Sequence, residues 1–181
     1  MKFMAPFATA ILAWVFASPA AGQEALDGVQ RHENARVLLE QALRIGDILP
    51  NLPPETGRRI ADERDTAIAS RNLTRFRELA ETKDYTIWNV AQHMDPLREA
   101  LTSLANGRFG SRQAEVEQWA RVAKLLSESS FYMGLEKMGQ MGLVSAPILI
   151  DGEAPSVRFQ EFRLNIHNNI LMPYMEGRLP D

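Results

Sequence analysis

Apolar residues recur at steps of three and four positions along most of this chain, which is the spacing of an α-helix with one buried face. The clearest stripe is formed by Ile87, Val90, Met94, Leu97, Leu101 and Leu104. This alternation of steps is typical of helices packed nearly side by side. Asp95-Pro96 interrupts the stripe, but the apolar positions keep their phase on both sides. We therefore expect one helix with a kink at Pro96, where proline removes a backbone donor.

The same spacing predicts further helices, separated by proline, glycine and capping residues. We expect them over 35–49, 54–69, 72–79 and 156–170, with another that begins after Ser111 and bends or ends near Gly134 or Gly139. The helix over 54–69 is the most polar, so it is expected on the outside. Suitable residues stand at the helix starts, with Pro54 as a first residue and Asn72, Ser111 and Ser156 as N-caps. The pattern predicts an all-α bundle of five or six helices with short connections.

One apolar segment lacks this helical spacing. Residues 143–150 read Leu-Val-Ser-Ala-Pro-Ile-Leu-Ile and are followed by the turn-forming pair Asp151-Gly152. The length suits a strand, but Pro147 would confine it to a sheet edge and no second strand is predicted to pair with it. We expect a short extended segment near 143–150 that is wedged against the helices.

The first residues have the layout of a secretory signal peptide. Lys2 is followed by an apolar run from Phe7 to Phe16 and then by small residues. We predict a signal peptide over 1–22 that is cut after Gly22, although a cut after Ala20 also fits. The run is short for a spanning helix, which needs about 20 apolar residues; an uncleaved membrane anchor is the alternative. Residues 23–181 then form a single helical domain, exported to the periplasm or the extracellular space, with no membrane span after signal removal.

Composition narrows the classes of function. The chain has no cysteine, which excludes disulfides, thiol catalysis, Cys-ligated zinc, iron–sulfur clusters and covalently attached haem. The formal net charge is −3, and no basic stripe is present, so nucleic acid is not expected as a partner. No serine stands in a Gly-x-Ser-x-Gly stretch and no glycine-rich phosphate loop is present.

Glu128 is the candidate catalytic residue. Residues 128–131 read Glu-Ser-Ser-Phe, and residues 139–143 read Gly-Gln-Met-Gly-Leu. These stretches resemble those of the goose-type lytic transglycosylases, whose catalytic glutamate lies in a Glu-Ser-x-Phe stretch followed by Gly-Leu-Met-Gln; the order of Leu, Met and Gln differs here. The resemblance implies an exported, mostly helical cell-wall glycan hydrolase with Glu128 as the acid and Phe131 as the aromatic residue. Such an acid must be kept protonated by an apolar pocket.

A helical wheel gives Glu128 a second interpretation. At about 100° per residue, Glu128 lies about 180° from the apolar side of a helix that continues through this region. Lys124 precedes it by four positions, which allows an ion pair on a solvated face. The buried side of that continuous helix would hold Trp119, Val122, Leu126 and Met133.

Methionine and histidine give a second candidate site, this time for a metal. Thioether sulfur suits Cu(I), and a bundle can also hold noncovalent haem between Met and His ligands. The candidate ligands in the last third of the chain are Met133, Met138, Met141, His167, Met172 and Met175. The alternative is that these methionines fill irregular gaps in the core or form an adaptable contact surface. No cofactor is therefore predicted, and neither His32, His93 nor His167 has a paired ligand spacing.

These observations favour a non-enzymatic function. We expect an exported soluble helical protein that binds another protein through the apolar segment Gly139 to Ile150, as an inhibitor, an immunity protein or a secretion accessory does. A cell-wall hydrolase that uses Glu128 and a copper- or haem-binding protein of the periplasm are the alternatives.

Overall fold

The computed structural model describes residues 26–143, 152, 153 and 155–179, except for the side chains of residues 129, 155 and 156. The predicted signal peptide over 1–22 lies outside these residues, and so does the predicted extended segment beyond Leu143. Within the described residues, every helix is too short or too polar to cross a membrane.

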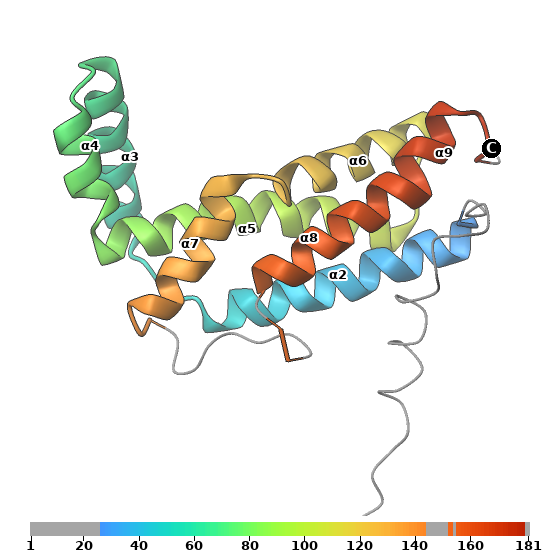
Figure 1. Ribbon diagram of the computed structural model, residues 1–181, viewed down its shortest axis with the longest axis horizontal. Helices are drawn as coiled ribbons and strands as arrows, with labels where there is room; N and C mark the ends of the chain where they lie inside the picture. Colours follow the sequence, from blue (N-terminus) through green and yellow to red (C-terminus); the bar gives the residue numbers. More distant parts are fainter. Residues whose placement is uncertain (1–25, 144–151, 154, 180–181) are drawn as a thin grey trace, which may run out of the picture.

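The prediction of an all-α fold is confirmed (Figure 1). Seven helical segments follow one another in the described part of the chain, against the five or six that the sequence predicts, because α7 is separate from α6. They are α2 (Gly28–Ile48), α3 (Pro54–Ala69), α4 (Leu73–Ala80), α5 (Lys83–Asn106), α6 (Arg112–Leu125), α7 (Ser129–Gln140), and a last segment that runs from α8 (Pro155–Ile166) through a π-helical stretch (His167–Leu171) into α9 (Met172–Met175).

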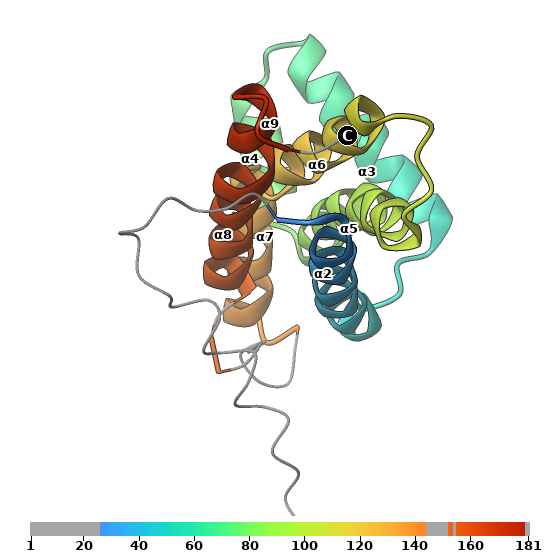
Figure 2. The same ribbon diagram turned by 90° about the vertical axis from the view of Figure 1, so that its right-hand side faces the viewer.

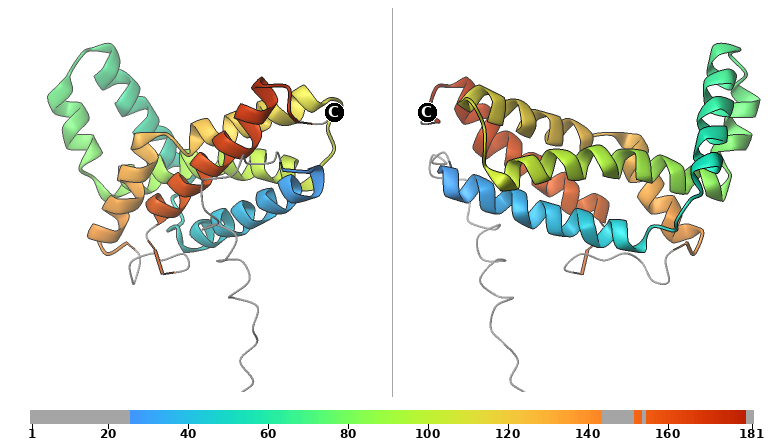
Figure 3. Two further views of the ribbon diagram at one scale, coloured as in Figure 1. Left: turned by 45° about the vertical axis from the view of Figure 1, so that its right-hand side comes forward. Right: turned by 180° about the vertical axis from the view of Figure 1, so that it is seen from behind.

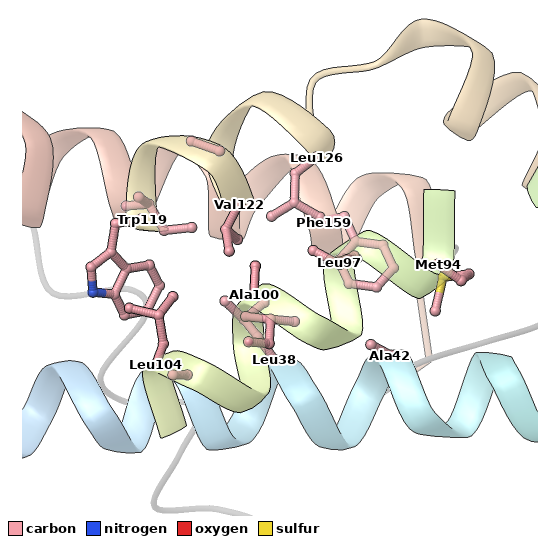
Figure 4. Packing of buried hydrophobic residues seen from close by; sticks show 14 of the residues in the cluster. Leu38, Ala42, Met94, Leu97, Ala100, Leu104, Trp119, Val122, Leu126 and Phe159 are labelled. Atoms are coloured by element: carbon pink, nitrogen blue, oxygen red, sulfur yellow. The ribbon is translucent and has the colours of Figure 1, made fainter. Parts of the chain in front are cut away.

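Helix α5 is the centre of the body. It packs against α2 on one side and against α6 and α7 on another, while α8 lies along α6 and α7 (Figures 1 and 2). The predicted stripe from Ile87 to Leu104 is buried at every position, and the helix continues through Pro96. Figure 4 shows how this stripe meets its neighbours: Leu97 and Leu104 of α5 lie among Leu38 of α2, Val122 of α6 and Phe159 of α8.

Most of the predicted helix starts are confirmed. The side chain of Asn72 accepts a hydrogen bond from the N–H of Arg75 at 3.0 Å, and Ser111 accepts one from the N–H of Ala114 at 3.2 Å. These bonds satisfy N–H groups that have no carbonyl one turn earlier. Pro54 is the first residue of α3. Ser156 is not an N-cap, because α8 already begins at Pro155.

Helices α3 and α4 form a hairpin at one end of the body, set steeply against α2 and α5 (Figures 1 and 3). Only Ile60 and Ala67 of α3 are buried, in agreement with its polar sequence. The hairpin rests on the first turns of α5, where the Arg64 guanidinium lies 4.9 Å from the centre of the Trp88 ring. The ring of Phe76 meets that of Tyr85 edge to face, with centroids 6.2 Å apart. Aromatic contacts thus attach this outer hairpin to the body.

The prediction of one helix through residue 128 is wrong. Helix α6 ends at Leu125, and α7 begins at Ser129. The Ser127 hydroxyl donates to the carbonyl of Ala123 at 2.6 Å, a local bond that competes with helix continuation. The N–H of Ser127 bonds to the carbonyl of Lys124, which tightens the last turn. The break changes the direction of every later side chain, so Met133 is 67% exposed instead of buried.

Candidate functional site

A groove lies between α4, the start of α5 and α7, at the end of the body that carries the hairpin (Figure 1). Its volume is about 530 Å³, which is within the range of pockets that bind ligands. The lining includes apolar side chains from all three helices, namely Phe76, Ala80, Tyr85 and Met133. Charged and polar groups complete it: Glu81, Thr86, Asn89, Ser130, Glu136, Lys137 and Gln140.

Gly134 determines how closely α7 approaches α5 beside this groove. A Cβ atom at this position would lie 2.7 Å from Cγ2 of Val90 and 3.2 Å from the side-chain amide of Asn89. The sequence suggests that this glycine ends or bends the helix, but Gly134 is buried in the middle of α7. Its function is close packing, which a single sequence does not distinguish from helix breaking.

Lys137 ties α7 to the end of α4 at the groove. Its Nζ donates to the carbonyl of Ala80 at 2.7 Å and to Oε2 of Glu81 at 3.0 Å. The Ala80 carbonyl belongs to the last turn of α4, where carbonyls lack partners within the helix and favour a cation. The positive charge of Lys137 therefore interacts with groups of the protein itself. Glu136 remains an exposed acidic group on the groove lining.

Tyr85 forms part of the groove wall and has a perturbed hydroxyl. Burial raises the pKa of Tyr85, and the nearby positive charge of Arg64 partly opposes this effect. The hydroxyl therefore remains protonated and neutral at physiological pH. It adds a hydrogen-bond donor to the groove lining.

A chain of polar contacts joins α5 to the first turn of α7. The side-chain amide of Asn89 donates to the carbonyl of Ser130 at 3.0 Å. One nitrogen of His93, Nδ1, lies 2.8 Å from the carbonyl of Asn89, and the other, Nε2, lies 3.1 Å from the hydroxyl of Ser130. The His93 ring stacks on Phe131 with centroids 5.7 Å apart.

Sequence reasoning missed this pair of a serine and a histidine. The two residues are far apart in the chain, and no motif of a serine nucleophile surrounds Ser130. Only the packing of α7 on α5 brings them together. The spacing of Asn89 and His93, one helical turn apart, is the one local signal, because it lets the ring reach the Asn89 carbonyl.

Glu128 occupies the N-cap position of α7, immediately after the break in the helix. Its side chain is half-buried, makes no capping hydrogen bond and does not line the groove. No ion pair joins it to Lys124, because the two residues belong to different helices. Of the residues in the transglycosylase-like stretch, Phe131 packs in the core and Ser130 lines the groove.

The candidate metal ligands are spread over the body. Met138 is fully buried in the core, whereas Met133 and Met141 of the same helix are exposed. Met172 and Met175 belong to α9, which lies at the opposite end of the body from α7 (Figures 1 and 3). His167 begins the π-helical stretch and is exposed. The fold therefore separates the methionines of α7 from those of α9.

The predicted contact segment Gly139 to Ile150 is described only as far as Leu143. Gly139 and Gln140 are the last residues of α7 and are exposed, and Gln140 lines the groove. The first residues of this apolar segment therefore lie at the groove.

Comparison of the chain with protein-family models, with curated proteins and with solved structures gives no match in any of the three.

Proposed function

We propose that this protein is an exported helical module that binds a partner protein through the groove between α4, α5 and α7. The observation that carries the proposal is the exposure of Met133, which is 67% accessible on an apolar groove of about 530 Å³. Methionine adapts to irregular surfaces and is common at contact sites. An apolar patch of this kind on a soluble surface is typical of a protein contact.

The partner segment that fits best is an amphipathic helix. Helices α4, α5 and α7 border the groove, and its walls are apolar over Phe76, Tyr85 and Met133. Such grooves bind the apolar face of a helix through residues spaced by three and four positions. Glu136 on the groove lining favours lysine or arginine beside that face. The apolar segment Gly139 to Ile150 follows directly and supplies further contact area.

Export is part of the same proposal. Residues 1–22 have the charged start, the apolar centre and the small exit residues of a signal peptide. Inhibitors, immunity proteins and secretion accessories combine export with a contact surface in this way. Mass spectrometry of the exported protein is expected to give a chain that begins at Gln23. A chain that keeps all of residues 1–22 would contradict the export route.

Site-specific cross-linking tests the contact surface. A photoreactive phenylalanine derivative replaces Met133, and the protein is irradiated in the producing cells and recovered from the exported fraction. We expect one discrete covalent adduct, and mass spectrometry then identifies the partner. Met175 is the matched control, because it is also highly exposed but lies on α9, away from the groove.

A charge reversal tests the partner's expected chemistry. Glu136→Arg is expected to reduce the adduct formed from position 133, because it places a positive charge against a basic partner. Equal adducts from positions 133 and 175, or no adduct from 133, would remove the support for this surface. No function is proposed for Glu128, which lies outside the groove, or for the methionines as metal ligands, because those of α7 and α9 are apart.

A further inference from the structure

We propose that Ser130 and His93 form a nucleophile and base pair that cleaves a carboxylic ester whose acyl group lies in the groove. This activity goes beyond the binding of a partner protein and does not depend on it. The pair is built from two helices and consists of the Ser130 hydroxyl and the His93 ring, and the backbone carbonyl of Asn89 contacts the ring.

Two contacts determine the proton positions on His93. A carbonyl oxygen can only accept, so the Nδ1 atom at 2.8 Å from the Asn89 carbonyl carries the proton. Nε2 of the neutral ring then has a free lone pair, and the Ser130 hydroxyl donates to it at 3.1 Å. This is the arrangement in which a histidine can take the proton of a serine nucleophile.

The ring and the serine are both held in place. The His93 ring stacks on Phe131, whose side chain is buried in the core, with an angle of 24° between the ring planes. The Asn89 side chain holds the Ser130 backbone by a hydrogen bond of 3.0 Å to its carbonyl. Ser130 remains exposed and lines the groove, so a bound ester can reach its hydroxyl.

Ser130 is the second residue of α7, a helix of 12 residues. The first N–H groups of a helix have no carbonyl one turn earlier and form its positive end. In this turn the N–H groups of Phe131 and Tyr132 bond to the carbonyl of Glu128. The N–H of Ser130 therefore remains available to stabilise the negative oxygen that develops on the substrate.

The reaction proceeds in two balanced steps. The Ser130 oxygen attacks the ester carbonyl carbon while its proton moves to Nε2 of His93, and the carbon becomes tetrahedral. The C–O bond to the alcohol breaks, and the leaving oxygen takes the proton from Nε2, which leaves an acylated Ser130. Water then attacks the acyl carbon, His93 accepts its proton and returns it to the serine oxygen, and the carboxylic acid is released.

The surroundings favour an ester with a short apolar acyl chain. The group that orients the His93 ring is the neutral carbonyl of Asn89, which stabilises a charged imidazole less than a carboxylate does. A substrate with an easily displaced alkoxide suits this weaker arrangement better than an amide. Phe76, Ala80 and Met133 provide apolar walls, and the carboxylate of Glu136 disfavours an acidic acyl group.

Labelling with a fluorophosphonate probe, followed by peptide mapping, tests the pair directly. We expect covalent label on Ser130 in the mature protein, and turnover of p-nitrophenyl butyrate above that of the buffer. Ser130→Ala is expected to abolish the label, and His93→Gln to lower both labelling and turnover by about 100-fold or more, the usual contribution of a general base. Circular dichroism confirms that the variants remain helical.

Matched variants separate this chemistry from unspecific reactivity. Ser103→Ala removes an exposed serine of α5, and His167→Gln removes an exposed histidine far from the groove. Both are expected to keep the full label and turnover. Absence of label on Ser130 in the unmodified protein, or label that is unchanged in His93→Gln, overturns the proposal even if a variant folds poorly.

Discussion

Arg31 of α2 and Glu115 of α6 form a buried ion pair, in which Nε lies 2.8 Å from Oε1 and both side chains are less than 10% exposed. Arg31 also donates to the carbonyl of Leu26, and Arg112 bonds to the second oxygen of Glu115. The pair joins the first and the fifth helical segments at the end of the body away from the groove (Figure 1).

Loss of one partner of this pair is expected to destabilise the fold strongly. Glu115→Gln leaves two arginines with buried charge and no carboxylate, which typically costs about 3–5 kcal/mol. Chemical denaturation followed by circular dichroism measures the change. The exposed pair of Arg121 and Glu99 at 3.1 Å is the control, and Glu99→Gln is expected to cost less than about 1 kcal/mol. Equal costs for the two variants would contradict the structural importance of the buried pair.

The same carboxylate makes stability depend on pH. Burial raises the pKa of Glu115, but the hydrogen bonds and positive charges of Arg31 and Arg112 outweigh burial, so the pKa lies below its ordinary value of 4.5. A lowered folded-state pKa gives stability that is complete above the unfolded value and is lost as pH falls through the folded value. We expect the unfolding free energy to fall from about pH 5 to about pH 3, and to fall less in Glu115→Gln. Urea titrations across this range measure the slope.

Two glycines of α7 are expected to respond in opposite directions to alanine. At Gly134 the new Cβ meets Val90 at 2.7 Å, so Gly134→Ala is expected to cost about 1–3 kcal/mol through overpacking. At Gly139 no atom lies within 4 Å, so Gly139→Ala is expected to be neutral or to stabilise the helix by up to about 1 kcal/mol. Thermal and chemical denaturation measure both. A stabilising Gly134→Ala would show that α7 does not pack closely on α5.

Substitution of Met133 and of Met138 by alanine tests the break between α6 and α7. Met138 is fully buried, so Met138→Ala is expected to cost about 2–5 kcal/mol. Met133 is 67% exposed, so Met133→Ala is expected to change the stability by less than about 0.5 kcal/mol. A continuous helix through residue 128 predicts a large cost at Met133, so denaturation of this variant distinguishes the two arrangements.

Much of the fold follows from local chemistry that can be read in the sequence. The stripe from Ile87 to Leu104, the caps at Asn72 and Ser111 and the first residue of α3 at Pro54 all agree with the structure. These features depend on neighbours within about one or two helical turns. The polar character of α3 likewise predicts its outer position.

The candidate site depended on contacts that local patterns do not contain. A short motif made Glu128 the candidate catalytic residue, yet the residue of this stretch that lines the groove is Ser130, two positions further on. The break before α7 lies at the bond between Ser127 and the Ala123 carbonyl, and nothing in the apolar spacing distinguishes this region from a continuous helix. A change in chain direction between α6 and α7 reorients every side chain of α7. The prediction of a continuous helix therefore placed Met133 on the buried face, although it is exposed.

The sequence by itself determined the helices, most of their ends and the faces that they bury, because a residue's propensity and its spacing to neighbours act over a few positions. Only the tertiary structure decided that α7 leaves the line of α6, that Lys137 reaches α4 and that Ser130 meets His93. These relationships join segments that are distant in the chain, and they exist because buried surfaces must fit one another in three dimensions. The groove and its chemistry are therefore properties of the packed body rather than of any one stretch.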